Sequence, residues 1–369
     1  MLVDGRDGDT MTSFDPQSIL QFAGYAFFIV FMLYGAKLQL MQMLAQIKSK
    51  MTRLAFLRNQ SLISLEMHIK KHIATISPEQ SKAIEILINS IAIPPVSNLD
   101  PAGMVPKMEN IFKTYDKYLK SGLRRIVGNV SQSDLENLTN SLEVAIELNI
   151  FFKVVDHFYR LAKKGDMMMA YMIKMALTQL MEMGEALFAA SAHFQSGLPI
   201  GDTFGPMVAS RLGGIQNTVF SDEETTVRDT VVVGRKVIVV KAKGPGGSVG
   251  NPGFAVQDIV KVMKPSLVIT IDAALRMESE KTGDVNEGVG TAMGGNGTER
   301  FRIEEATVGI PVLTIVCKMN MKEAISQMPK VVLDQVTPVY ERVLQLIREN
   351  SESGETVIVV GVGNSMGCE

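Results

Sequence analysis

The sequence predicts an α/β domain in its C-terminal part, preceded by an all-α helical domain and by one transmembrane helix near the N-terminus. Three observations predict this order. An uncharged apolar stretch occupies residues 16–36, helical periodicity continues from there to about residue 196, and short β-branched runs alternate with helical segments over residues 197–369. Glycine usage changes at the same point, since 22 of the 31 glycines follow residue 196.

Charge and cysteine content narrow the classes of function. The 37 basic and 39 acidic residues give a net charge of -2. Such a chain has no overall basic field, so nucleic acid is not an expected partner. The two cysteines, Cys317 and Cys368, lack partners at the spacing of zinc or redox motifs, which indicates a reducing compartment.

The apolar stretch at residues 16–36 predicts a membrane anchor behind a short extracytoplasmic segment, residues 1–15. A helix of this length measures about 31 Å, close to the hydrocarbon thickness of a bilayer. A cleaved signal peptide or a buried core helix are the alternatives. The acidic residues before the stretch and the lack of a small-residue cleavage site favour the anchor.

The flanking charges predict the orientation of this anchor. Seven basic residues and a single acid, Glu66, lie between Lys37 and Lys71, whereas Arg6 is the one basic residue before the stretch. Basic flanks stay on the cytoplasmic side. We therefore expect a single-pass protein of the cell membrane, with its N-terminus outside and its soluble domains in the cytoplasm.

Residues 37–76 predict an amphipathic helix. Its apolar stripe comprises Leu40, Leu44, Ile47, Met51 and Leu54. Two heptads are short for a coiled coil, so packing on the next domain or on the membrane surface is favoured over dimerisation.

Residues 77–196 predict a helical domain rich in methionine, because 16 of the 24 methionines precede residue 197. A cluster of them comprises Met167, Met168, Met169, Met172, Met175, Met181 and Met183. Methionines at helical spacing are typical of an adaptable core, and the alternative is a face that docks a partner.

Residues 197–369 predict a three-layer α/β domain with a mostly parallel sheet. The strand-like runs are residues 231–233, 236–240, 267–271, 312–316 and 356–360, and helix-like segments include residues 255–263 and 336–348. Such alternation is typical of a buried parallel sheet covered by helices.

The candidate catalytic residues in this domain are aspartates, because no histidine follows His193. That inventory excludes a Ser-His-Asp triad or a His-ligated metal built within the domain, and neither a metal nor a cofactor is expected. Asp272 follows the run at residues 267–271, where a parallel sheet binds ligands. Asp202 lies in a glycine-rich loop. The alternative for each aspartate is a helix or turn cap. His68 and His72 are four residues apart, but without a third ligand they are interpreted as surface residues of a helix.

Several residues in glycine-rich loops are candidates for ligand binding. The loop at residues 243–253 joins a strand to a helix, and its amides could cradle an anion near Lys241 and Lys243. The loop matches neither the P-loop nor the dinucleotide pattern. The candidates are Gly246, Gly247, Gly250, Asn251, Arg276, Gly295, Asn296, Gly363 and Asn364.

Three segments together resemble the spore germination protease and hydrogenase maturation endopeptidase superfamily. Residues 264–273, KPSLVITIDA, are similar to its strand that ends in the second active-site aspartate, and residues 201–206, GDTFGP, to the loop that carries the first. Residues 309–315, GIPVLTI, are similar to its later strand. The chain as a whole also resembles an uncharacterised archaeal membrane protein family.

The resemblance implies a membrane-anchored, peptidase-like hydrolase with Asp202 and Asp272 as its catalytic pair, acting on a protein or peptide. The family's threonine-rich stretch is replaced by residues 281–287, and the nickel-binding histidine of the hydrogenase branch has no counterpart. A metal-free mechanism is therefore implied. The alternative is a non-catalytic membrane-tethered binding or scaffold protein, because one fold hosts many functions.

The position of the last strand implies a circular permutation relative to that superfamily, in which a strand with a G-x-G-N turn comes first. Here the run at residues 356–360 leads into Gly361-Val362-Gly363-Asn364 near the end of the chain. Permutation is tolerated when the termini lie close together. We expect this run inside the sheet beside residues 267–271, with Asn364 beside the cleft of Asp202 and Asp272.

Overall fold

The computed structural model describes residues 16–93, 103–213, 218–221, 224–294 and 297–369. They belong to two compact units. The first unit contains the chain up to Thr52 together with residues 154–178, and the second contains residues 53–153 and 179–369. Three long helices, α1 (Pro16–Ile69), α4 (Gln132–Lys163) and α5 (Met167–Ser196), contribute to both units.

In the first unit, α1 packs against the hairpin of α4 and α5. Buried Met43 contacts Ala162 and Ala170, and Leu40 and Leu44 pack against the same cluster. The predicted stripe of the amphipathic segment therefore contacts neighbouring helices of the same chain. The helix ends at Ile69, earlier than the expected residue 76.

No single helix in the described part of the chain combines the length and hydropathy of a membrane span. The helical stretches Leu20–Met32 and Tyr34–Ile69 meet at a bend of 43°. Taken together, these two stretches have the length and the hydropathy of a membrane span.

In the second unit, short helices pack on the C-terminal part of α1 and on α4. Helix α2 (Pro78–Ile88) begins at a capping box of Ser77 and Gln80, and α3 is Met104–Val127. Their core includes Leu65, Leu119, Leu123, Leu138 and Leu142. The expected all-helical character of residues 77–196 is thus confirmed for the described residues of this range.

His68 is buried, so the interpretation of His68 and His72 as surface residues of a helix is wrong for His68. Its side chain is 3% exposed, and Nδ1 lies 2.8 Å from the Ser141 hydroxyl. Burial, with nearby Lys71 and His72, lowers the pKa of His68 to about 4. The ring is therefore neutral and forms part of the helical core.

The methionine cluster agrees with the favoured interpretation in part, because Met167 packs against the buried cluster around Met43, whereas three others are exposed. Met168, Met172 and Met175 on α5 are 66%, 52% and 82% exposed, so they do not fill a core. They lie on one face of the helix, at spacings of four and three residues.

The α/β region contains a seven-stranded mixed sheet with the order β1-β2-β3-β7-β4-β6-β5. The strands are β1 (Thr218–Ser221), β2 (Thr225–Val232), β3 (Arg235–Ala242), β4 (Leu267–Leu275), β5 (Val285–Val289), β6 (Val312–Met319) and β7 (Thr356–Gly361). β7 is parallel to both β3 and β4, and β4 is parallel to β6. The expectation of a mostly parallel sheet therefore holds for the four central strands, whereas β1, β2 and β5 pair antiparallel.

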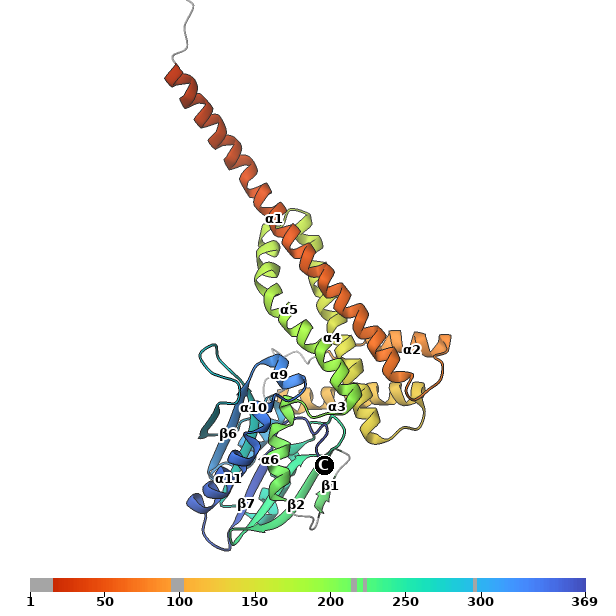
Figure 1. The fold of residues 1–369 in the computed structure, drawn as a ribbon, viewed down its shortest axis with the longest axis vertical. Helices are drawn as coiled ribbons and strands as arrows, with labels where there is room; N and C mark the ends of the chain where they lie inside the picture. The colour runs from red at the N-terminus through yellow and green to blue at the C-terminus, as the bar shows by residue number, and fades with distance from the viewer. Residues whose placement is uncertain (1–15, 94–102, 214–217, 222–223, 295–296) are drawn as a thin grey trace, which may run out of the picture. The chain divides into compact units, whose positions relative to one another are not determined.

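Helices cover both faces of the sheet, which confirms three layers (Figure 1). On one face, α6 (Phe204–Leu212) and α11 (Val336–Asn350) cover Val357 and Val359 of β7. On the other face, α7 (Pro252–Met263) and α8 (Thr298–Ala306) pack in the cluster that contains Ile358 and Val360. The remaining elements are η1 (Gly201–Thr203), α9 (Met321–Ile325) and α10 (Lys330–Leu333).

β7 confirms the expected position of the last strand. Val357 pairs with Leu267 on one side and with Val237 on the other, so the strand is internal to the sheet. All five residues from Val357 to Gly361 are buried.

The buried neutral His68 predicts acid-dependent loss of stability. The folded state keeps the ring neutral, whereas the unfolded state gains a proton below pH 6.5. Stability should therefore fall by about 3 kcal/mol as the pH drops from 6.5 to about 4. In urea unfolding of the purified full-length chain, His68→Asn should remove this part of the pH dependence. His157→Asn, at an exposed histidine, serves as the control, and an unchanged slope in His68→Asn would contradict the assignment.

Candidate active site

Asp202 lies in the 3-10 turn η1, immediately before α6. The turn is fixed by the amide of Ile200, which donates to the Thr203 hydroxyl, and by that hydroxyl, which donates to the carbonyl of Met366. The carboxylate of Asp202 does not cap the helix. Instead its Oδ2 accepts a hydrogen bond of 2.8 Å from the amide of Asn364.

Close backbone approach brings this turn to the ends of the central strands. A Cβ on Gly205 would lie 2.2 Å from the carbonyl oxygen of Val362 and 2.4 Å from that of Ile271. A Cβ on Gly363, whose φ is +124°, would lie 2.0 Å from the carbonyl oxygen of Asp202. Glycine is therefore required at both positions for η1 and α6 to seat against β4 and β7.

Asp272 lies within β4, because the strand continues to Leu275 instead of ending in a turn. Its side chain is buried. Oδ1 accepts from the amide of Ala273 at 2.7 Å, and Oδ2 accepts from the amide of Gly294 at 3.2 Å. The neighbouring loop is further attached to the strand by Ala292, whose amide donates to the Thr270 hydroxyl. The alternative of a turn cap is therefore wrong.

The two aspartates line one cavity of about 480 Å³ in the second unit. Its other walls come from α3, α4 and the loops around β2, α7 and β5. The described lining residues are Glu109, Phe112, Lys113, Tyr115, Asp116, Glu143, Glu224, Val249, Gly250, Asn251, Pro252, Ala273, Met293, Gly294, Thr298, Glu299, Val362 and Gly363. The site is thus shared between the sheet and the helices that precede it.

The electrostatics of the pair favour protonation. Burial raises the pKa of Asp202 to about 6, opposed by the hydrogen bond from Asn364. Burial and repulsion from Asp202 raise the pKa of Asp272 to about 7. Near neutral pH such a pair presents one acid, with Asp272 as the preferred site of the proton, and one carboxylate.

Further carboxylates surround the pair. Glu143 is one of these and lines the cavity. Burial also raises the pKa of Glu299. This lining disfavours anionic ligands.

The helical wall is held by charged contacts that the sequence does not reveal. Arg302 of α8 forms an ion pair with Glu109 of α3. Lys113 lies 2.8 Å from the same glutamate. Phe254 of α7 stacks beneath both cations, at 3.8 Å from Arg302 and 3.6 Å from Lys113. On α3, Glu109, Phe112, Lys113 and Asp116 share one face at spacings of three and four residues, the signal that could have indicated this wall.

The glycine-rich loop at residues 243–253 does not form the expected anion cradle. Gly250 and Asn251 line the cavity. Gly246 and Gly247 pack on α4 instead, where the amide of Gly247 donates to Asn137 and its carbonyl accepts from Asn140. At the start of α7, the amide of Gly253 donates to the Glu299 carboxylate at 2.6 Å. A side chain of the protein therefore occupies the position that an anion would take.

The remaining candidates divide between the cavity and other places. Gly363 lines the cavity, and Asn364 contacts it through the Asp202 carboxylate. Arg276 lies beyond β4, where its side chain donates to the carbonyl of Glu280 at 3.2 Å. Gly295 and Asn296 lie outside the described residues. No group of three or more His, Cys, Asp or Glu in the described ranges is arranged to hold a metal ion.

The raised pKa values predict that Asp272 weakens the fold at neutral pH. The folded state binds a proton that the unfolded state releases near pH 3.8, so stability decreases as the pH rises towards about 7. As the pH rises from about 5 to about 8, the free energy of unfolding of Asp272→Asn should therefore increase by about 2–4 kcal/mol relative to that of the unsubstituted chain. Urea unfolding at both pH values measures this gain. Asp258→Asn, at an exposed aspartate of α7, should show none, and an equal gain in the two variants would contradict the prediction.

Two family models match the chain. Residues 21–197 match the N-terminal domain of the protein of unknown function DUF1512, and residues 200–369 match the DUF1512 C-terminal domain of unknown function. No curated protein and no solved structure matches significantly. The chain thus carries both domains of the DUF1512 family, in the order in which that family is defined.

Proposed function

We propose that this protein is a membrane-anchored, peptidase-like hydrolase that uses Asp202 and Asp272 as an acid–base pair. The observation that carries the proposal is the shared cavity. Two carboxyl groups from separate elements, a turn before α6 and the strand β4, line it together, and both have raised pKa values. Perturbed carboxyl pairs in a cavity are typical of catalytic sites.

The proposed reaction is metal-free hydrolysis of an amide. Ionised Asp202 accepts a proton from water as the water oxygen bonds to the carbonyl carbon. Protonated Asp272 donates its proton to the carbonyl oxygen. Asp202 then gives the proton it took from water to the nitrogen as the C–N bond breaks, and Asp272 takes back a proton from one hydroxyl as the carbonyl re-forms. The products are a carboxylic acid and an amine, so no oxidant or other reactant is needed.

The hydrogen bonds around the pair support these roles. The amide of Asn364 stabilises charge on Asp202, which suits a general base. Asp272 has the higher pKa of the two, which suits a general acid. Apolar lining from Phe112, Tyr115 and Met293 provides contact area for a peptide.

The sheet order also supports the proposed relation to the spore germination protease and hydrogenase maturation endopeptidase superfamily. β7 lies beside β4, and the G-x-G-N turn that follows it reaches Asp202. A circular permutation of the superfamily's chain would give this arrangement.

The proposed chemistry predicts loss of cleavage when either carboxylate is removed. Asp272→Asn and Asp202→Asn should each reduce hydrolysis about 10²- to 10⁴-fold, because each removes one proton-transfer group. The measurement is a proteomic comparison of cells that carry each variant with cells that carry the unsubstituted chain, in which uncleaved precursors should accumulate. Asp258→Asn provides the matched control. Identical proteomes for all variants would favour a binding or scaffold protein.

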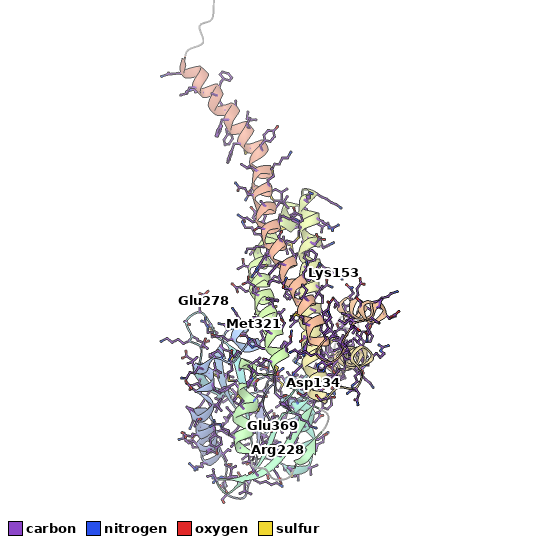
Figure 2. All side chains as sticks on the ribbon, turned by 45° about the vertical axis from the view of Figure 1, so that its right-hand side comes forward. Asp134, Lys153, Arg228, Glu278, Met321 and Glu369 are labelled. Atoms are coloured by element: carbon purple, nitrogen blue, oxygen red, sulfur yellow. The ribbon has the colours of Figure 1, made fainter. Side chains whose placement is uncertain are left out.

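Large apolar side chains along residues 20–34 of α1 are exposed, among them Phe27 at 73% and Phe31 at 62% (Figure 2). A bilayer would remove these apolar side chains from water, so their exposure in the structure supports the proposed anchor. With the basic flank inside, a tag after Glu369 should be protected from protease in right-side-out vesicles. A tag before residue 16 should be cleaved in the same vesicles. Cleavage of the C-terminal tag in intact vesicles would reverse the proposed orientation.

A further inference from the structure

The first unit places the turn between α4 and α5 beside α1, close to the end of the apolar stretch. We call residues 163–168 the hairpin tip. Ala162 and Ala170, which flank it, contact Met43 of α1. On the first turns of α5, the Tyr171 hydroxyl accepts a hydrogen bond from Gln39. The tip is thus fixed at the level of residues 39–43.

This level corresponds to the headgroup layer of a bilayer. Gln39 and Met43 lie three and seven residues beyond Ala36, which is about 4.5 and 10 Å along the helix. The headgroup region is roughly 5–8 Å thick on each side. If the apolar stretch crosses the hydrocarbon layer, the hairpin tip reaches the headgroups.

The side chains at this level have the composition of a lipid-contacting surface. Lys163 and Lys164 on the tip and Lys37 on α1 are exposed, and none of them forms an ion pair within the described part of the chain. On the same hairpin tip, the side chain of Met168 is 66% exposed. The one acid of the tip, Asp166, accepts a hydrogen bond from the amide of Met169 at 3.1 Å, so it caps α5.

From this geometry we infer that the hairpin tip is a second membrane contact, which binds anionic phospholipid headgroups through Lys163 and Lys164 and inserts Met168 among them. The inference rests on the proposed anchor. Basic residues beside an exposed apolar side chain are the usual combination at an anionic interface. A second contact fixes the rotation of α1 about its own axis, which a single span leaves free.

Fluorescence can test this directly, because the chain contains no tryptophan. Three single-tryptophan variants of the full-length chain, Phe28→Trp, Met168→Trp and Met175→Trp, are reconstituted into nanodiscs that contain phosphatidylserine. Brominated lipids with bromine at the middle of the acyl chains or near the headgroups quench tryptophans at those depths. Met175 is the matched control, since it is 82% exposed on the same helix and lies about 10 Å further along it.

We expect quenching of Phe28→Trp by the deep bromines and of Met168→Trp by the shallow ones, with little quenching of Met175→Trp. In the Met168→Trp chain, Lys163→Glu with Lys164→Glu should reduce shallow quenching by at least about twofold. Quenching at Phe28 with equal, weak quenching at Met168 and Met175 would overturn the inference and leave the anchor standing. An unquenched Phe28→Trp would remove the anchor as well. If Met168→Trp is strongly quenched whether or not the lysines are substituted, recognition of headgroups by Lys163 and Lys164 is overturned. If Met168→Trp is shielded from aqueous acrylamide but no lipid quenches it, a second copy of the chain covers the tip and the inference is overturned.

Discussion

The central constraint in the α/β region is that its last strand lies in the middle of the sheet. β7 has hydrogen-bonded partners on both sides, β3 and β4, so the sheet has no continuous core until residues 356–361 are in place. Alternate side chains of β7 enter the clusters on the two faces, Val357 and Val359 on one and Ile358 and Val360 on the other. Both helical layers therefore depend on one short strand whose partners are distant in sequence, which is typical of slow, nonlocal folding.

The same strand sets the geometry of the aspartate pair. Asp272 is on its neighbour β4, and the residues that follow β7 reach Asp202 through the amide of Asn364. The buried segment continues as far as Met366, and the hydroxyl of Ser365 donates towards the carbonyls of Lys243 and Gly246. The turn before α6 and the glycine-rich loop are thus held by the same few residues. One carboxyl on a central strand and another in a turn held by the residues after the neighbouring strand need no long side chains to converge, which favours a rigid site.

Local patterns in the sequence were sufficient for the long helices and the four central strands, whereas the convergence of Asp202 with Asp272 was implied by the family resemblance. Runs such as residues 356–360 are β-branched and apolar, and their length alone indicates buried strands. β5 could not be found in this way, because Asn286, Glu287, Gly288 and Val289 are exposed and carry no apolar alternation. The cavity wall formed by α3 was also missed. It depends on contacts such as that of Arg302 with Glu109, which are remote in sequence. The exposure of methionines on α5 could not be predicted either, because exposed methionines and methionines buried in a core have the same helical spacing.

Charge in the cavity distinguishes the site from an ordinary polar cluster. The ion pairs of Glu109 with Arg302 and of Lys120 with Glu224 attach α3 to its neighbours and are explained by structure alone. Among the described residues, no cation forms an ion pair with Asp202 or Asp272. Desolvation raises both pKa values, so in ionised form the two groups oppose folding. Two asparagines would satisfy comparable hydrogen bonds without this cost. Two desolvated carboxyls that line a cavity and have raised pKa values have the properties that proton transfer requires, which supports the proposed catalytic role of Asp202 and Asp272.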